Sequence, residues 1–144
     1  MSNRTLAIIK PDAFNAAKAG KILALLEERG FVLRAARVLH LTAAQAGEFY
    51  AVHRGRPFYD DLVSFMTSAP CMPIVLEQAG AVAALREAIG ATDPAEAADG
   101  TVRKLYAESK GRNAIHASDS DDNAAREIAF FFAESDVAPA PAAA

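Results

Sequence analysis

The chain has 144 residues, enough for one domain with a single hydrophobic core, which we expect at residues 1–136. Its 15 basic and 18 acidic residues give a net charge of −3, which excludes a basic nucleic-acid coat protein and a polybasic membrane binder. Cys71, the one cysteine, cannot form an internal disulfide, and no apolar run is long enough for a secretory signal or a membrane span, so we expect a cytoplasmic domain.

The first half of the chain alternates between strand and helix patterns. A β-rich run ends at Pro11, which cannot donate to a strand ladder, and a segment with Ile22 and Leu26 on one helical face follows. Thr42 and Gln45 have the spacing of a capping box and predict the start of another helix. The expected elements of this half are strands at residues 5–9 and 31–41 and helices at residues 18–29, 42–52 and 59–66.

The second half continues this alternation around one long irregular segment. Residues 91–111 are polar and interrupted by Pro and Gly, which predicts a functional or disordered loop. Residues 121–123 are expected to cap the last helix, and the Ala/Pro-rich residues 137–144 are expected to form a disordered tail. The other expected elements are strands at residues 74–76 and 113–116, a helix at 81–89 closed by Gly90, and a final helix whose apolar face holds Ala124, Ile128, Phe131 and Phe132.

The order of these elements indicates the fold class. Strands that alternate with helices predict an α/β or α+β sandwich in which helices cover at least one face of a sheet. A split βαββαβ arrangement fits the number and order of the expected strands.

Three histidines are candidates for chemistry near neutral pH. His40 lies in an apolar run and is expected to be structural, and His53 at a helix end is suited to the helix dipole. His116 lies in the polar run of residues 113–120 between a strand and a helix. That run is compatible with a functional imidazole and also with a loop that only caps the next helix.

A histidine nucleophile needs an acceptor that holds its second ring nitrogen. Glu127, in the first turns of the last helix, is placed to reach back to His116, and the alternative is a solvated carboxylate beside Arg126. Lys10, Arg86 and Arg103 would together suit a phosphate chain, although each alone reads as a surface charge. Because no phosphate-binding glycine motif occurs, a phosphate site here must use side chains.

From about Arg4 to Phe132 the chain resembles the nucleoside diphosphate kinase family. The matching motifs, in the order of the family, are residues 5–12 (TLAIIKPD), 53–70 (HRGRPFYDDLVSFMTSAP), 90–94, 100–103 and Asn113-x-x-His116-x-Ser118-Asp119. The resemblance implies a ferredoxin-like sandwich with a four-stranded antiparallel sheet. It also implies a ping-pong reaction, in which a nucleoside triphosphate such as ATP phosphorylates a histidine and a nucleoside diphosphate then collects the phosphate.

The resemblance also implies a role for each matching residue. In the reaction itself, the residues are the nucleophile His116, its orienting carboxylate Glu127, the supporting Ser118, and Tyr50 and Lys10 beside the transferred phosphate. For the nucleotide, they are Arg86, Thr92 and Arg103 on the phosphates, Phe58 stacked on the base and Asn113 on the sugar. Mg²⁺ would arrive on the nucleotide phosphates, and stacking without readout of base edges implies broad base tolerance.

The chain departs from the family pattern at three places. Ala117 follows the histidine where the family usually has Gly, which strains the loop only if that position needs a positive φ. Residues 14–19 lack a basic residue often found there, and the Ala/Pro tail leaves open whether the expected homo-oligomer is a dimer, tetramer or hexamer. Two other functions stay open: a ligand-binding module without catalysis, and a phosphocarrier loaded on His116 by a partner protein.

Overall fold

A computed structural model describes residues 3–138. Its strands are β1 (Arg4–Ile9), β2 (Val32–Ala36), β3 (Met72–Glu77) and β4 (Ile115–Ala117). Its α-helices are α1 (Pro11–Asn15), α2 (Ala19–Glu28), α3 (Ala43–Phe49), α4 (Tyr59–Met66), α5 (Ala81–Ile89), α6 (Val102–Tyr106) and α7 (Asp121–Phe131). Two 3₁₀ turns follow α3 and α7, at Ala51–His53 and Glu134–Asp136.

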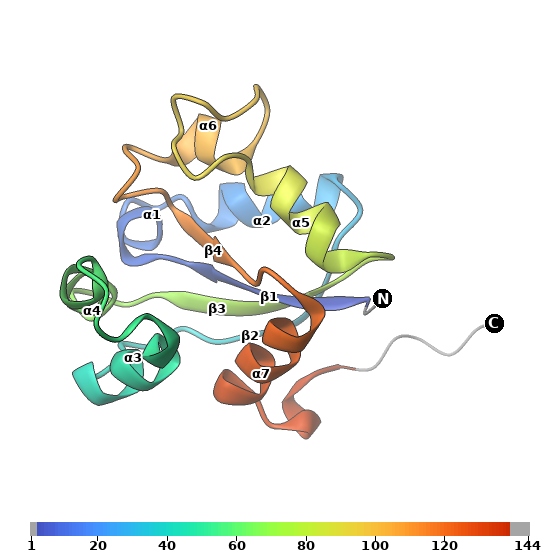
Figure 1. The fold of residues 1–144 in the computed structure, drawn as a ribbon. Coiled ribbons are helices and arrows are strands. Elements are labelled where there is room, and N and C mark those ends of the chain that lie inside the picture. The colour runs from blue at the N-terminus through green and yellow to red at the C-terminus, as the bar shows by residue number, and fades with distance from the viewer. Residues whose placement is uncertain (1–2, 139–144) are drawn as a thin grey trace.

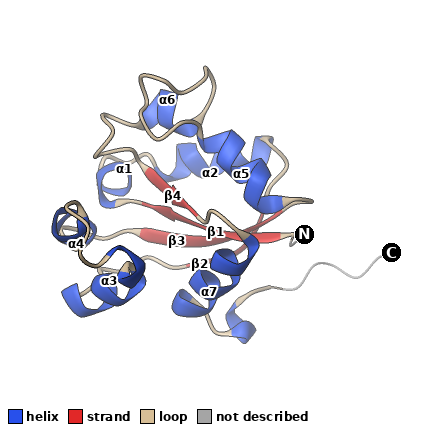
Figure 2. Cartoon of the chain, viewed as in Figure 1, coloured by secondary structure: helices blue, strands red, loops and turns tan. Residues whose placement is uncertain are grey.

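The four strands form one antiparallel sheet in the order β2-β3-β1-β4. Helix α2 connects β1 to β2, and α5 and α6 lie between β3 and β4 in the chain. Helices α2 and α5 cover one face of the sheet, and α3, α4 and α7 lie on the other side (Figure 1). This is the ferredoxin-like βαββαβ sandwich that the sequence predicts, with additional short helices in its connections (Figure 2).

Two hydrophobic cores form because successive side chains of a strand point to opposite faces. In β1, Ala7 and Ile9 join the core under α2 and α5, whereas Leu6 and Ile8 join the core under α3, α4 and α7. Each of these buried aliphatic side chains contributes about 1.5–3 kcal/mol relative to an exposed one, with alanine below that range. In β4 the same alternation sends Ile115 and Ala117 into the first core, so His116 between them faces α3 and α7.

The second strand is shorter than the sequence predicts. We expected a strand at residues 31–41, but regular pairing ends at Ala36, after a register shift between Leu33 and Ala35. The next partner across the sheet is Pro73, which accepts a hydrogen bond from the Arg37 N–H but has no N–H to return. Pairing resumes only as an isolated bridge between Leu39 and Cys71.

Two helices are missed by the sequence analysis because they are too short to show a periodic pattern. Helix α1 begins directly at Pro11, whose fixed φ suits the first helical position. Helix α6 lies inside the segment expected to be an irregular loop, and the Thr101 hydroxyl caps it by accepting from the Lys104 N–H at 3.3 Å. The capping box of Thr42 and Gln45 is confirmed at the start of α3.

The end of the described chain packs against the sheet. Val137 is buried, and the Ala138 N–H donates to the Arg34 carbonyl at 2.9 Å, so the first two residues of the predicted tail contact the rest of the domain. The rest of the predicted tail, residues 139–144, lies outside the described residues.

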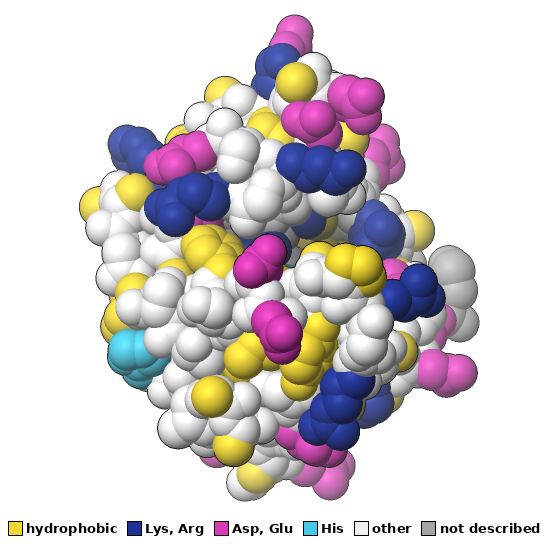
Figure 3. Space-filling view, turned by 60° about the vertical axis from the view of Figure 1, so that its left-hand side comes forward, with side chains coloured by type: hydrophobic (Ala, Val, Ile, Leu, Met, Phe, Trp, Pro, Cys, Tyr) yellow, Lys and Arg dark blue, Asp and Glu magenta, His cyan; other side chains and the backbone are white. Residues whose placement is uncertain are grey.

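Positive and negative side chains are interspersed over the face in Figure 3. Within residues 3–138, no helix is both long and apolar enough to cross a membrane.

Candidate active site

His116 lies in the middle of the three-residue strand β4 and pairs with Ile8 of β1. Its side chain is 22% exposed and points to the face of the sheet that carries α3 and α7. Phe49 and Tyr50, at the end of α3, meet the imidazole edge-on, with ring centroids 5.6 Å and 6.3 Å away. These aromatic contacts restrict the plane of the ring while one side of it borders a pocket of about 170 Å³.

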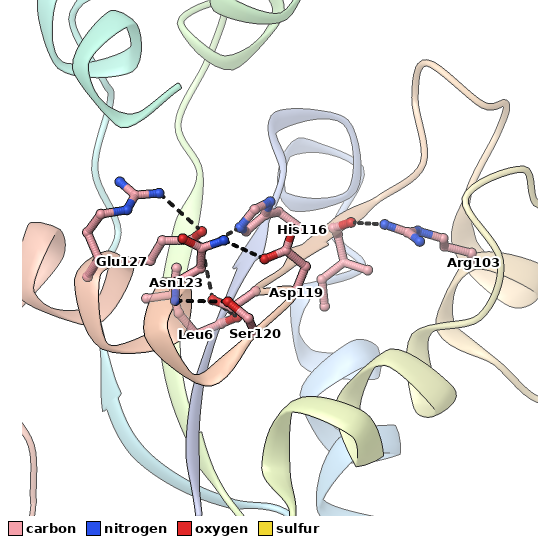
Figure 4. A network of polar contacts seen from close by, with 10 residues as sticks. Leu6, Arg103, His116, Asp119, Ser120, Asn123 and Glu127 are labelled. Atoms are coloured by element: carbon pink, nitrogen blue, oxygen red, sulfur yellow. Dashed lines mark hydrogen bonds and ion pairs between the residues drawn. The ribbon is translucent and has the colours of Figure 1, made fainter. Parts of the chain in front are cut away.

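Glu127 holds the imidazole from α7. Its Oε1 accepts from His116 Nε2 at 2.6 Å and from the Ser118 hydroxyl at 2.9 Å, and its side chain is only 7% exposed. Figure 4 shows Glu127 beside His116 on the first turns of α7. The interpretation of Glu127 as a solvated carboxylate is therefore wrong, although Arg126 does lie 3.6 Å from its other oxygen.

This contact defines the state of the imidazole. An ionised carboxylate only accepts hydrogen bonds, so Nε2 carries the ring proton and Nδ1 keeps its lone pair. Ser118 is itself fixed, because its N–H donates to the Leu6 carbonyl at 3.1 Å. The same loop also caps α7: the Ser120 hydroxyl, and not residues 121–123, accepts from the Asn123 N–H at 3.1 Å.

Lys10 lines the His116 pocket and contacts the buried Asn113. Lys10 Nζ donates to Asn113 Oδ1 at 2.9 Å, and the Asn113 amide donates to the Thr92 carbonyl at 3.3 Å. Burial, helped by the charge of Arg103, lowers the pKa of Lys10 to about 8, and the carboxylate of Asp12 opposes this shift. Lys10 lines both the His116 pocket and a larger cleft of about 700 Å³.

Arg103 ties α6 to the strand that carries His116. Its Nη2 donates to the Ile115 carbonyl at 2.8 Å (Figure 4). Its Nη1 donates to the Gly90 carbonyl at 3.1 Å, and the residue is buried. Burial and then the charge of Arg86 lower its pKa to about 10. Arg86, Thr92 and Arg103, the predicted phosphate ligands, line a common hollow of about 360 Å³.

The larger cleft has an aromatic rim. Phe58 is 49% exposed at the start of α4 and lines the cleft together with Leu62 and Phe65 of the same helix. The cleft is also lined by Lys110, Gly111 and Arg112. An exposed phenyl ring bordering a cleft that also contains Lys10 and Thr92 is suited to stacking with a planar group.

The other candidates from the sequence are also located. Tyr50 is buried, which raises the pKa of its hydroxyl far above the ordinary value, and its ring stacks on His53 at 6.3 Å. His53 lines the His116 pocket, although we assigned it only to a helix end, and His40 bonds the Thr67 carbonyl at 2.7 Å as a structural histidine. The contact of Phe49 with the imidazole is missed by the sequence analysis, because Phe49 reads only as a core residue.

Ala117 does not strain the loop. Within residues 3–138 only Ala17 and Ala114 are non-glycine residues with a positive φ, and Ala117 is an ordinary β4 residue paired with Ala7. The strain that we considered for Ala117 is found three residues earlier, at Ala114, with a φ of 74°.

A ferredoxin-like sandwich that sets a carboxylate-held histidine in one pocket with a lysine of lowered pKa has the character of a phosphotransferase. Comparison with known proteins makes this specific, because the family model for nucleoside diphosphate kinase matches residues 3–137. The chain belongs to the nucleoside diphosphate kinase family.

Individual relatives agree with the family model. The chain is 58% identical over 134 residues to a nucleoside diphosphate kinase of Chlorobium luteolum, covering 93% of this chain and 96% of that one. It is 56% identical over 140 residues to that of Sorangium cellulosum, covering 97% of each. Among solved structures, the Aquifex aeolicus nucleoside diphosphate kinase superposes with a TM-score of 0.92 at 45% identity, covering 94% of this chain and 98% of that one. The nucleoside diphosphate kinase of Halobacterium salinarum, solved in complex with CDP, superposes with a TM-score of 0.92 at 37% identity, covering 98% of this chain and 94% of that one.

Proposed function

We propose that the chain moves the γ-phosphate of a nucleoside triphosphate to a nucleoside diphosphate through a phosphohistidine at His116. The observation that carries this proposal is the 2.6 Å contact between His116 Nε2 and Glu127, which leaves Nδ1 as the nucleophile. Lys10 and Tyr50 line the same pocket as the imidazole. Family membership supports the same reaction.

The reaction divides into two displacements at phosphorus. In the first, Nδ1 of His116 forms a bond to the γ-phosphorus while the bond to the bridging oxygen breaks, and the diphosphate leaves. In the second, an oxygen of the acceptor diphosphate attacks the phosphohistidine, and Nδ1 recovers its lone pair. Nδ1 has no proton to lose, so Glu127 serves to stabilise the positive charge that develops on the ring.

The cations around the cleft supply the electrostatic part of catalysis. Charge develops on the transferred phosphoryl group, and Lys10 is proposed to meet it, while Arg86, Arg103 and Thr92 hold the phosphate chain. Asn113 would bind the sugar through the amide that now contacts Lys10 and Thr92. Phe58 would stack on any base through its face, which gives broad base tolerance.

Nucleotide-kinase reactions of this family usually depend on a divalent metal, which we propose is Mg²⁺ carried on the nucleotide. The nearby carboxylates are consistent with this, since Glu127 in the His116 pocket is engaged by His116 and Ser118, and Asp61 is the one carboxylate among the described residues that line the larger cleft. Phosphate oxygens are the ligands that Mg²⁺ prefers at such sites. The ion would supply further neutralisation of phosphate charge.

We also propose a homo-oligomer built on a dimer, with a tetramer or hexamer as the larger assembly. β2 is an edge strand of the sheet, and the apolar side chains Val32, Leu33 and Val38 beside this edge are 46%, 37% and 60% exposed. A second copy that covers them would remove apolar surface from water.

The proposed cytoplasmic location is supported by Cys71, which is buried as a free thiol of the kind that a reducing compartment maintains.

The decisive test is the intact mass of the protein after incubation with ATP and Mg²⁺. We expect one added phosphoryl group that is acid-labile, that disappears on addition of a nucleoside diphosphate, and that is absent in His116→Ala. A ligand-binding module would bind nucleotide without this mass increase, and a phosphocarrier would gain it only with a partner protein. Full turnover in His116→Ala would contradict the proposal.

A further inference from the structure

The three residues before His116 form a tight turn. The Ile115 N–H donates to the Asn113 carbonyl at 2.9 Å, and Ala114 between them has a φ of 74°. A hydrogen bond from residue i+2 to residue i around a central residue of this φ defines a γ-turn of the strained type. Since alanine disfavours a positive φ, surrounding contacts must hold Ala114 in place.

Both backbone groups of Ala114 are held by the corner between β1 and α1. Its N–H donates to Oδ2 of Asp12 at 3.0 Å in the protein interior, and its carbonyl accepts from the Lys10 N–H at 2.9 Å. On its other side, Arg103 bonds the Ile115 carbonyl. The turn is therefore fixed by one side chain from the Lys-Pro-Asp corner, one backbone amide and one guanidinium.

Asp12 makes this contact at a clear cost. Its side chain is 7% exposed, and within residues 3–138 its Oδ1 is buried without a hydrogen-bond partner. Burying a carboxylate is unfavourable unless hydrogen bonds or a nearby cation compensate, and here the charge of Lys10 interacts favourably with Asp12. The contact made by its other oxygen is the bond to the Ala114 N–H.

We propose that Asp12 is a positioning residue for phosphate transfer, which holds the γ-turn at Ala114 and thereby sets where β4 presents His116 between Lys10 and Glu127. Strand β4 has only three residues and pairs with β1 alone. So few hydrogen bonds between strands do not by themselves fix the position of its side chains, and contacts at its ends contribute. The γ-turn also contains Asn113, whose side chain contacts Lys10, so the same turn sets the spacing of both groups. This role rests on the proposed function of His116.

The test measures the rate constant for phosphorylation of His116 by ATP in single-turnover experiments, together with the nucleotide affinity. Asp12→Ala is expected to slow phosphorylation on the order of 10- to 100-fold with little change in affinity, because misplacing a nucleophile by a fraction of an ångström is costly. Asp12→Asn keeps an acceptor oxygen for the Ala114 N–H and should retain most of the rate. Asp12→Ala combined with Ala114→Gly should recover part of the loss, because glycine adopts this φ without strain.

The matched control is Asp136→Ala, which removes a carboxylate that accepts from the Ala133 N–H at 2.8 Å in the 3₁₀ turn after α7, and which should leave the rate unchanged. If Asp12→Ala does not fold, Asp12→Asn still decides: a rate near that of the wild type supports the proposal, and a loss on the order of 10- to 100-fold overturns it. A loss in Asp12→Asn as large as that in Asp12→Ala, with no recovery on Ala114→Gly, would mean that Asp12 acts through its charge on Lys10 and would overturn the proposal. Wild-type rates in Asp12→Ala would also overturn it, whereas absence of phosphate on the wild-type protein would refute the function of His116 itself.

Discussion

At the scale of single residues, the site depends on groups whose ordinary properties are changed by burial. Glu127 is a buried carboxylate whose burial is compensated because His116 and Ser118 both donate hydrogen bonds to one of its oxygens. Lys10 and Arg103 are cations in a poorly solvated environment, so the pKa of each is lowered. Groups held in this way need little reorganisation when charge develops on a transferred phosphate.

Replacing Glu127 by Gln should therefore lower the rate of His116 phosphorylation. The amide keeps the shape but cannot stabilise the developing positive charge of the imidazole, and a buried hydrogen bond to a charged group contributes about 1.5–3 kcal/mol, or on the order of 10- to 100-fold in rate. Single-turnover phosphorylation by ATP measures this directly. Glu28→Gln on the exposed end of α2 is the control, and an unchanged rate in Glu127→Gln would show that the contact is only structural.

The lowered pKa of Lys10 predicts an alkaline limit to activity. A lysine with a pKa of about 8 loses its charge as the pH rises through 8, whereas an ordinary lysine keeps it for two further units. We expect kcat/KM for the triphosphate to fall above about pH 8, since this ratio reports the free enzyme. In Lys10→Arg the guanidinium stays charged, so the decline near pH 8 should be absent at a lower overall rate; a decline at the same pH would assign it to another group.

At the scale of elements, helix α7 both packs on the core and positions a site residue. It covers the core with Ala124 and Phe131, and it delivers Glu127 to the imidazole. Its start is defined by Ser120, whose hydroxyl accepts from the Asn123 N–H. A short strand, β4, and a capped helix thus meet at the loop that contains Ser118.

Ser120→Ala should weaken the protein because the first turn of α7 loses its cap. N-cap removal costs about 1 kcal/mol of stability, and we expect a loss of this size in the free energy of unfolding by urea. Ser135→Ala, in the 3₁₀ turn that follows α7, is the control and should have a smaller effect. A free energy equal to that of the wild type would mean that water replaces the cap.

At the scale of the whole molecule, the ferredoxin-like sheet keeps the proposed reaction centre and the proposed subunit contact apart. His116 belongs to β4 at one edge of the sheet, and the exposed apolar residues lie at or beside β2 at the other edge. Assembly through β2 would therefore leave the proposed nucleotide cleft open to solvent. We therefore expect that substitutions can change oligomer assembly without changing phosphate transfer, and the reverse.

Leu33→Glu should dissociate the oligomer without removing the chemistry. A charge at a buried apolar contact is costly, so we expect a monomer in sedimentation or light scattering, with His116 phosphorylation retained. The matched control is Leu105→Glu on α6, where the side chain is 55% exposed and no contact is proposed. An unchanged mass in Leu33→Glu would place the subunit contact elsewhere.

Local sequence patterns predict the elements with a clear periodicity or cap, the ferredoxin-like order, and the residue types of the site. Strand β1, helices α2 and α4 and the cap of α3 follow from local patterns, because side-chain spacing and capping are local properties. Short pieces such as α1 and α6 have too few residues for a period and are invisible at that level.

The contacts between those residues depend on long-range packing, which no local pattern encodes. Lys10 and Asn113 are 103 residues apart in the chain and 2.9 Å apart in space, and Asp12 bonds Ala114 across 102 residues. The positive φ of Ala114 cannot be read from an alanine, because the surrounding contacts impose it against the preference of the residue. Local chemistry therefore selects the components of this site, and long-range packing sets their geometry.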